Sequence, residues 1–237
     1  MYVIELKDLP GLFSALRSRG FTVIGPTLRD GAIVLDAITG VDDLPRGWTD
    51  VQVAAGYQVR KRKDEALFGF SVSPMSWKKF LFPPRVKLFA AERSGKGFVI
   101  AGDKGGQPSA PAKLAFLGLR SCELHALAIH DKVFASGQYA DTTYTEVRKS
   151  AIVIAVNCTA AGGTCFCDSM GTGPRAASGY DIALTEILAD GRHHFLAEGG
   201  TPLGDRTRLA FVAYSRGRSL GKALGKFAAR GGRVDRA

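Results

Sequence analysis

Residues 113–134 read KLAFLGLRSCELHALAIHDKVF, and residues 151–157 read AIVIAVN. The run over 113–119 is short, apolar and typical of a buried strand, and the pattern that follows over 123–134 is helical. Residues 151–157 form a second buried strand by the same criterion. Buried strands that alternate with helices predict an α/β or α+β fold, with a mixed sheet flanked by helices and cysteine-bearing loops at strand ends.

The N-terminal part, residues 1–60, has the pattern of a small α/β subdomain. Apolar residues at 9, 12, 13 and 16 share one helical face, and Gly20 suits the end of that helix. A short strand is expected over 21–24, stopped by Gly25-Pro26, and the turn residues at 29–31 predict a hairpin with a strand over 32–36. Residues 61–203 are expected to form the cysteine-bearing α/β domain, with a helix over 181–188 and a strand over 193–198.

The tail, residues 204–237, differs from the rest of the chain. It carries nine Lys or Arg and two Asp, so it holds +7 of the net charge of +10. We expect a poorly ordered, solvated end. An amphipathic helix around 220–227 that binds RNA, a membrane or an acidic partner is a second possibility, and an aberrant gene end is a third.

Composition and motifs narrow the class of protein. The chain is 46% hydrophobic and 23% charged, as globular proteins are. No apolar run approaches the roughly 18 residues that span a bilayer, and residues 1–10 lack the apolar block of a secretory signal, so we expect a soluble cytoplasmic protein. A Rossmann fingerprint, a P-loop, a Ser-His-Asp motif and an H-E-x-x-H motif are all missing, which disfavours direct nucleotide binding and hydrolysis.

Four cysteines stand in the middle of the chain: Cys122, Cys158, Cys165 and Cys167. In a reducing compartment they indicate metal ligands or a redox thiol system rather than disulfides. Cys122 follows the first buried strand at the start of a helix, and Cys158 ends the second strand. Because open α/β sheets place their sites at one edge, the two strand ends and the Gly-rich loop around Cys165-Phe166-Cys167 are expected to converge there.

Cysteine thiolates hold iron–sulfur clusters, normally four for one [4Fe–4S] unit, and glycines let backbone amides approach the sulfurs. Gly162, Gly163, Gly171 and Gly173 surround the C-x-C pair, and Arg120 and the start of the helix add positive charge. The spacing matches neither the ferredoxin pattern nor the paired C-x₂-C of structural zinc. An iron–sulfur cluster, a zinc ion and free thiols therefore all remain possible from spacing alone.

Several motifs together resemble the beta subunit of sulfhydrogenase-type nickel–iron hydrogenases and the A subunit of anaerobic sulfite reductase. They are Arg120 to Ala126, Asn157-Cys158-Thr159, Thr164 to Pro174 and Gly179-Tyr180-Asp181, with similar blocks at 20–27 and 77–84. The resemblance implies a non-catalytic electron-transfer subunit of a multi-subunit oxidoreductase. It also implies a [4Fe–4S] cluster on Cys122, Cys158, Cys165 and Cys167. The implied partners are a flavoprotein subunit that handles NAD(P)H and a hydrogenase or sulfite reductase catalytic subunit. From the sequence itself, neither a membrane nor nucleic acid is expected as a partner.

The family continues into a ferredoxin-like domain with two more clusters, whereas this sequence has no cysteine after Cys167. The sequence is therefore expected to be truncated or frame-shifted after about residue 203. The alternatives are a zinc-binding structural or assembly module and a gene remnant. His125, three residues after Cys122, is either a ligand or hydrogen-bond partner of a cluster sulfur or an ordinary structural histidine. Glu123 and Asp168 flank cysteines and either tune the potential of a cluster or are explained by helix capping or solvent exposure.

Overall fold

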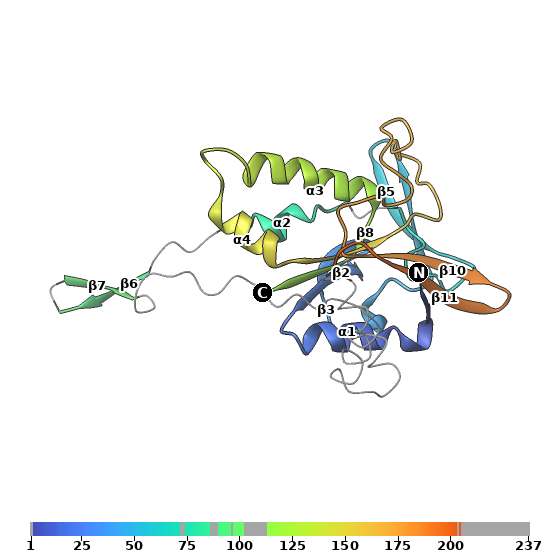
Figure 1. Cartoon of the computed structure of the whole chain (residues 1–237), viewed down its shortest axis with the longest axis horizontal. Helices are drawn as coiled ribbons and strands as arrows, with labels where there is room; N and C mark the ends of the chain where they lie inside the picture. Colours follow the sequence, from blue (N-terminus) through green and yellow to red (C-terminus); the bar gives the residue numbers. More distant parts are fainter. Residues whose placement is uncertain are drawn as a thin grey trace.

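Figure 1 shows a computed structural model of the chain, which describes residues 2–71, 74–85, 90–95, 97–101, 113–202 and 204. A seven-stranded mixed sheet forms its centre, in the order β1-β11-β10-β9-β8-β2-β3. Strands β2, β8, β9 and β10 pair in parallel, and β3, β11 and β1 add antiparallel pairs at the two sides. The seven strands are β1 (Tyr2–Glu5), β2 (Thr22–Arg29), β3 (Ala32–Ile38), β8 (Leu114–Leu119), β9 (Ile152–Val156), β10 (Ile182–Ala189) and β11 (Arg192–Gly199). The predicted class, a mixed sheet flanked by helices, is confirmed.

Helices cover both faces of this sheet (Figure 1). Helix α1 (Pro10–Arg17) lies on one face, and α2 (Lys78–Leu81), α3 (Ser121–Phe134) and α4 (Thr142–Ser150) lie on the other. Strand β9 shows why both faces are apolar: Ile152, Ile154 and Val156 join the core on the α1 side, while Val153 and Ala155 join the core on the α3 side. A strand buried on both faces reads as a continuous apolar run, as this one does.

Two hairpins lie outside the main sheet. Strands β4 (Trp48–Val53) and β5 (Gly56–Lys61) form one, and β6 (Ala90–Ser94) and β7 (Gly97–Ala101) form the other. Two 3-10 turns, Leu6–Asp8 and Val41–Asp43, complete the described elements. Phe98, in the short apolar run of β7, is 77% exposed, unlike the apolar residues of the central strands.

Strand β8 contains a bulge that sets the direction of the residues after it. The pairing with β9 shifts between Leu117 and Leu119, and Gly118 between them has a φ of +102°. As a result Leu117 packs on the α1 side and Leu119 on the α3 side, although they are two residues apart. An added residue of this kind re-aims a strand end and is common next to functional sites. Here it turns Arg120 toward the α1 side.

Two elements differ from the predictions. Residues 182–189 form strand β10 rather than a helix, held between β9 and β11. Strand β2 continues through Pro26 to Arg29 instead of stopping at Gly25, because its pairing with β8 ends at Ile24 and Pro26 then has a neighbouring strand on one side only.

Strands from both sides of residue 60 share the main sheet, and the domain boundaries at 60 and 203 stay predictions. The helix expected around 220–227 and nearly all of the basic tail lie outside the described residues. Within the described part of the chain, no helix has the length and apolar character needed to cross a membrane.

Candidate functional site

Two parallel strands end at the same edge of the sheet and bring the cysteines toward one another. Strand β8 leads into Cys122 in the first turn of α3, and β9 leads into Cys158. Cys165 and Cys167 lie in the connection between β9 and β10, in which the structure describes no regular element. The part of this connection that holds Cys158, Cys165 and Cys167, residues 158–175, is called the cysteine loop below. Parallel strands require such a crossover, and the site predicted at the strand ends is built on it.

The thiol of Cys122 lies within electrostatic range of Cys158 and Cys167, and that of Cys158 lies within range of Cys165 and Cys167. Burial raises the pKa of Cys122 to about 11, with further contributions from Glu123, Cys158 and Cys167. Burial also raises the pKa of Cys158, where Arg120 opposes the increase and the thiols of Cys165 and Cys167 add to it. The structure thus places all four predicted residues in one neighbourhood, where the other thiols contribute to the raised pKa values of Cys122 and Cys158.

The cysteine loop is fastened to the sheet edge and to the start of α3. The hydroxyl of Ser121 donates to Arg175 O, at the end of the loop, at 3.1 Å. Directly after the loop, Ala176 N donates to the side-chain oxygen of Asn157 at 2.8 Å. Gly173 lies between two parts of the site: a Cβ there would be 3.1 Å from Cys167 Sγ and 3.5 Å from Ser121 Cβ. The separation from Ser121 is ordinary van der Waals contact, so it is the side chain of Cys167 that a Cβ at this position would crowd.

The β4–β5 hairpin supports the other end of the loop. The hydroxyl of Thr164 donates to Gln52 Oε1 at 2.7 Å, and Gln52 in turn donates to Ser71 Oγ. Ser71 donates its main-chain N–H and its hydroxyl to Asp50 at 2.7 Å and 2.6 Å. Sequence reasoning did not find Asp50, Gln52 or Ser71, because nothing in the sequence relates residues about 100 positions apart.

The glycines around Cys165 and Cys167 have different structural roles. The main-chain N–H of Gly162 donates to Cys165 Sγ at 3.2 Å, which is the amide-to-sulfur contact that the Gly-rich loop predicts. Gly163 instead lies against the hairpin, where a Cβ would meet Gln52 O at 2.5 Å. Gly171 has no atom within 4 Å of a Cβ position, and its φ of +63° marks a turn.

The charged residues beside the cysteines have structural partners or are exposed. Glu123 accepts from Arg120 N at 2.7 Å and from Trp77 Nε1 at 2.9 Å, so it caps α3, and burial raises its pKa. Helix capping, the simple explanation for Glu123, is confirmed. His125 and Asp168 lie exposed.

A shallow cavity of about 250 Å³ opens beside Cys122. It is lined by Cys122, Glu123 and His130 from α3 and by Trp77 and Lys78 from the start of α2. Cys122 and Cys165 are exposed, and Cys158 and Cys167 are half-buried. The cysteine neighbourhood is therefore close to the surface of the described chain.

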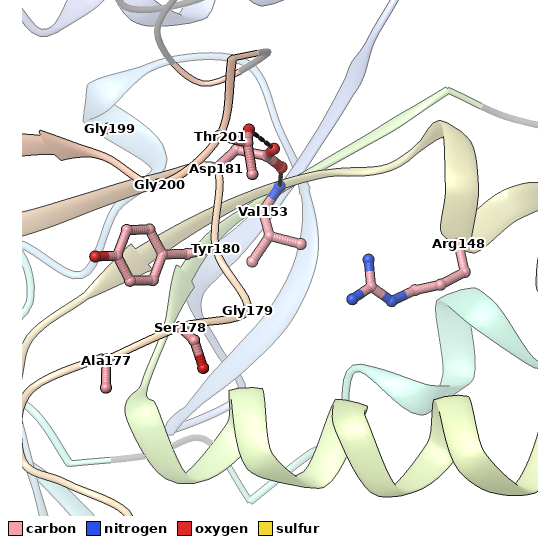
Figure 2. A pocket seen from close by; sticks show the side chains of 10 residues that line it. All are labelled: Arg148, Val153, Ala177, Ser178, Gly179, Tyr180, Asp181, Gly199, Gly200 and Thr201. Atoms are coloured by element: carbon pink, nitrogen blue, oxygen red, sulfur yellow. Dashed lines mark hydrogen bonds between the residues drawn. The ribbon is translucent and has the colours of Figure 1, made fainter.

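A second cavity, of about 500 Å³, lies at the opposite edge of the sheet (Figure 2). Asp181 accepts there from Val153 N at 2.8 Å and from the hydroxyl of Thr201, which joins the start of β9 to the chain after β11. These bonds give Asp181, part of the Gly179-Tyr180-Asp181 block, a structural role. Arg148 reaches toward this cavity from α4 and pairs with Asp131.

The donor set at the cysteine edge suits a thiophilic metal centre. Thiols with raised pKa values are protonated near neutral pH, and a bound metal is what deprotonates such groups. A buried cation, Arg120, and an amide N–H on Cys165 Sγ are in place to offset the charge of several thiolates. Among the described residues, no three or more His, Cys, Asp or Glu side chains converge closely enough to hold a single metal ion.

Comparison with known proteins gives one curated relative. The beta subunit of sulfhydrogenase 2 from Pyrococcus furiosus is 34% identical over 124 residues, which cover 52% of this chain and 34% of that protein. The chain therefore spans about a third of the length of the curated relative it matches. No family model and no solved structure matches the chain. Over about half of its length, this chain is related in sequence to a hydrogenase beta subunit.

Proposed function

We propose that this chain is an electron-transfer subunit of a multi-subunit oxidoreductase of the hydrogenase or sulfite reductase type, and that Cys122, Cys158, Cys165 and Cys167 bind one [4Fe–4S] cluster. The observation that carries the proposal is the gathering of all four cysteines of the chain at the carboxyl edge of β8 and β9. Similarity to a protein named a sulfhydrogenase beta subunit supports the same class.

Different residues of the chain would have different roles in holding the cluster. The four thiols supply the ligands, Gly162 donates its amide to one sulfur, and Gly173 leaves room for the side chain of Cys167. A bound cluster supplies one-electron transfer. Because Cys122 and Cys165 are exposed, electrons would enter and leave through this face, toward a flavoprotein subunit on one side and a catalytic subunit on the other.

Anaerobic purification tests the proposal. We expect a brown protein with about four iron and four sulfide per chain and a reduced-state EPR signal. Cys165→Ser should lower the iron and sulfide content. Ser169→Ala, a change at an exposed position in the same loop, is the matched control and should keep both.

The competing function is a structural zinc module, since thiols also bind zinc. It predicts a colourless protein with zinc bound in a redox-silent site. A preparation that holds only zinc, or no metal, after anaerobic reconstitution with iron and sulfide would overturn the electron-transfer proposal.

A further inference from the structure

Arg120 is a charged side chain buried beside the cysteines. It follows β8, precedes Cys122 by two residues and is 1% exposed. Its Nη2 donates to Phe68 O and Phe70 O, both at 2.7 Å, and its Nη1 lies 3.3 Å from Asn157 O. The guanidinium carbon also lies 4.9 Å from the ring centroid of Phe70. The guanidinium is thus enclosed by main-chain carbonyls and an aromatic ring.

This guanidinium has no carboxylate partner. None of the ion pairs among the described residues includes Arg120, and its buried Nε has no hydrogen-bond partner. The neighbouring acid, Glu123, bonds to the main-chain N–H of Arg120 rather than to its side chain. A buried charge is costly unless an opposite charge compensates it. Two cysteines lie next to this charge in the fold: Cys122 follows Arg120 by two residues, and Cys158 follows Asn157, whose main-chain carbonyl accepts from Arg120.

The positive charge acts on the cysteines across the sheet edge. Its Nη1 donates to the carbonyl of Asn157, directly before Cys158, so the guanidinium favours a thiolate there and opposes the increase in the pKa of Cys158 that burial causes. Guanidinium groups stay charged at all accessible pH values, so this charge is permanent. It is also poorly screened, because salt screens buried charges much less than exposed ones.

We propose that Arg120 is the built-in counter-charge of the redox centre held by the four cysteines, and that it stabilises the reduced form of that centre. This inference rests on the proposed function. Reduction adds one electron to a centre that already carries the charge of four thiolates, and no proton moves to or from Arg120. Since a fixed positive charge attracts the reduced form more than the oxidised form, it raises the reduction potential.

A purely structural role is the alternative, because Arg120 also clamps a chain segment. Residues 66–71 are buried, and Arg120 holds two of their carbonyls. Glu186 holds the same segment from the opposite side, accepting from Leu67 N at 2.6 Å and from Phe68 N at 2.9 Å. A clamp alone would affect stability and cluster content, but it would not move the potential of the protein that retains its cluster.

The test is an EPR-monitored redox titration with dithionite on the anaerobically reconstituted full chain. Arg120→Gln removes the charge, and Arg120→Lys keeps it while losing the planar fork. Arg175→Gln is the control, since it removes a positive charge from the cysteine loop at a side chain that is 71% exposed. Iron and sulfide content, measured first, tests cluster binding by itself.

At full cluster content, Arg120→Gln should lower the ratio of reduced to oxidised centre at a fixed ambient potential by about tenfold, which is about 59 mV for one electron. Arg120→Lys should lie much closer to the wild-type potential, and Arg175→Gln should leave it unchanged. An unchanged potential in Arg120→Gln would overturn the inference while leaving the cluster proposal intact. Failure of both Arg120 variants to fold, seen by circular dichroism, would overturn it in favour of the clamp.

Discussion

Replacing Gly118 by alanine tests whether the bulge in β8 is fixed by its surroundings. A Cβ at this position would lie 3.2 Å from Pro26 Cδ and 3.3 Å from Phe68 Cε1, so two rigid rings would have to move by a few tenths of an ångström. The φ of +102° adds backbone strain of about 1–3 kcal/mol. Overpacking of a close-packed core costs about 1–3 kcal/mol more. We therefore expect Gly118→Ala to lose about 2–6 kcal/mol of unfolding free energy in total.

Urea unfolding of the metal-free protein, followed by tryptophan fluorescence and circular dichroism, measures this loss. With a slope of about 2 kcal/mol per molar urea, the midpoint should fall by about 1–3 M. Gly31→Ala is the matched control, because Gly31 has a φ of +72° but no atom within 4 Å of a Cβ position. It should cost only the strain, about 1–2 kcal/mol. If Gly118→Ala cost no more than Gly31→Ala, the packing of the bulge against both rings would be refuted.

Three further results are expected. Gly173→Ala should lower iron content after reconstitution while circular dichroism stays unchanged, because the added methyl group would crowd Cys167 Sγ; full iron content would contradict this account of the loop. Glu186→Ala should cost about 3–5 kcal/mol in urea unfolding, since two buried main-chain N–H groups of residues 66–71 lose their acceptor; a loss under 1 kcal/mol would refute it. In the metal-free protein, iodoacetamide should modify Cys122 with a pH midpoint near 11 rather than 9, and because the folded state holds this proton more tightly, stability should fall as pH rises from 9 to 11; a midpoint at or below 9 would contradict the raised pKa of this thiol.

The sheet could be predicted in part because its central strands have a clear sequence pattern. Residues 114–119 and 152–156 are apolar on both faces, and the hairpin around Asp30-Gly31 has turn residues with positive φ at both positions. The same signal occurs at Asp190-Gly191, where φ is 52° and 70°. It marks the β10–β11 hairpin and would have corrected the helix predicted over 181–188. That run is apolar enough for either element, and its two neighbouring strands decide the outcome.

The neighbourhood of the four cysteines was also predictable, because parallel strands place their carboxyl ends at one edge. Their role as ligands stays a prediction. The supports of the site could not be predicted, since they depend on contacts between distant segments. Gln52 meets Thr164, and Arg120 meets the carbonyls of Phe68 and Phe70. Every residue has a main-chain carbonyl, so the residue types at these positions give no sign that their carbonyls accept hydrogen bonds from Arg120.

Because of the bulge in β8, the number of residues between Leu117 and Cys122 decides on which face of the sheet Arg120 lies. Side chains alternate between the faces of a strand, so loss of one residue between Leu117 and Cys122 would turn Arg120 toward the α3 layer and away from residues 66–71. The cysteine loop has no such alternation to preserve. When related sequences are aligned, we therefore expect insertions and deletions to fall within residues 158–175 and to be absent from residues 114–122, even where the residue types there vary.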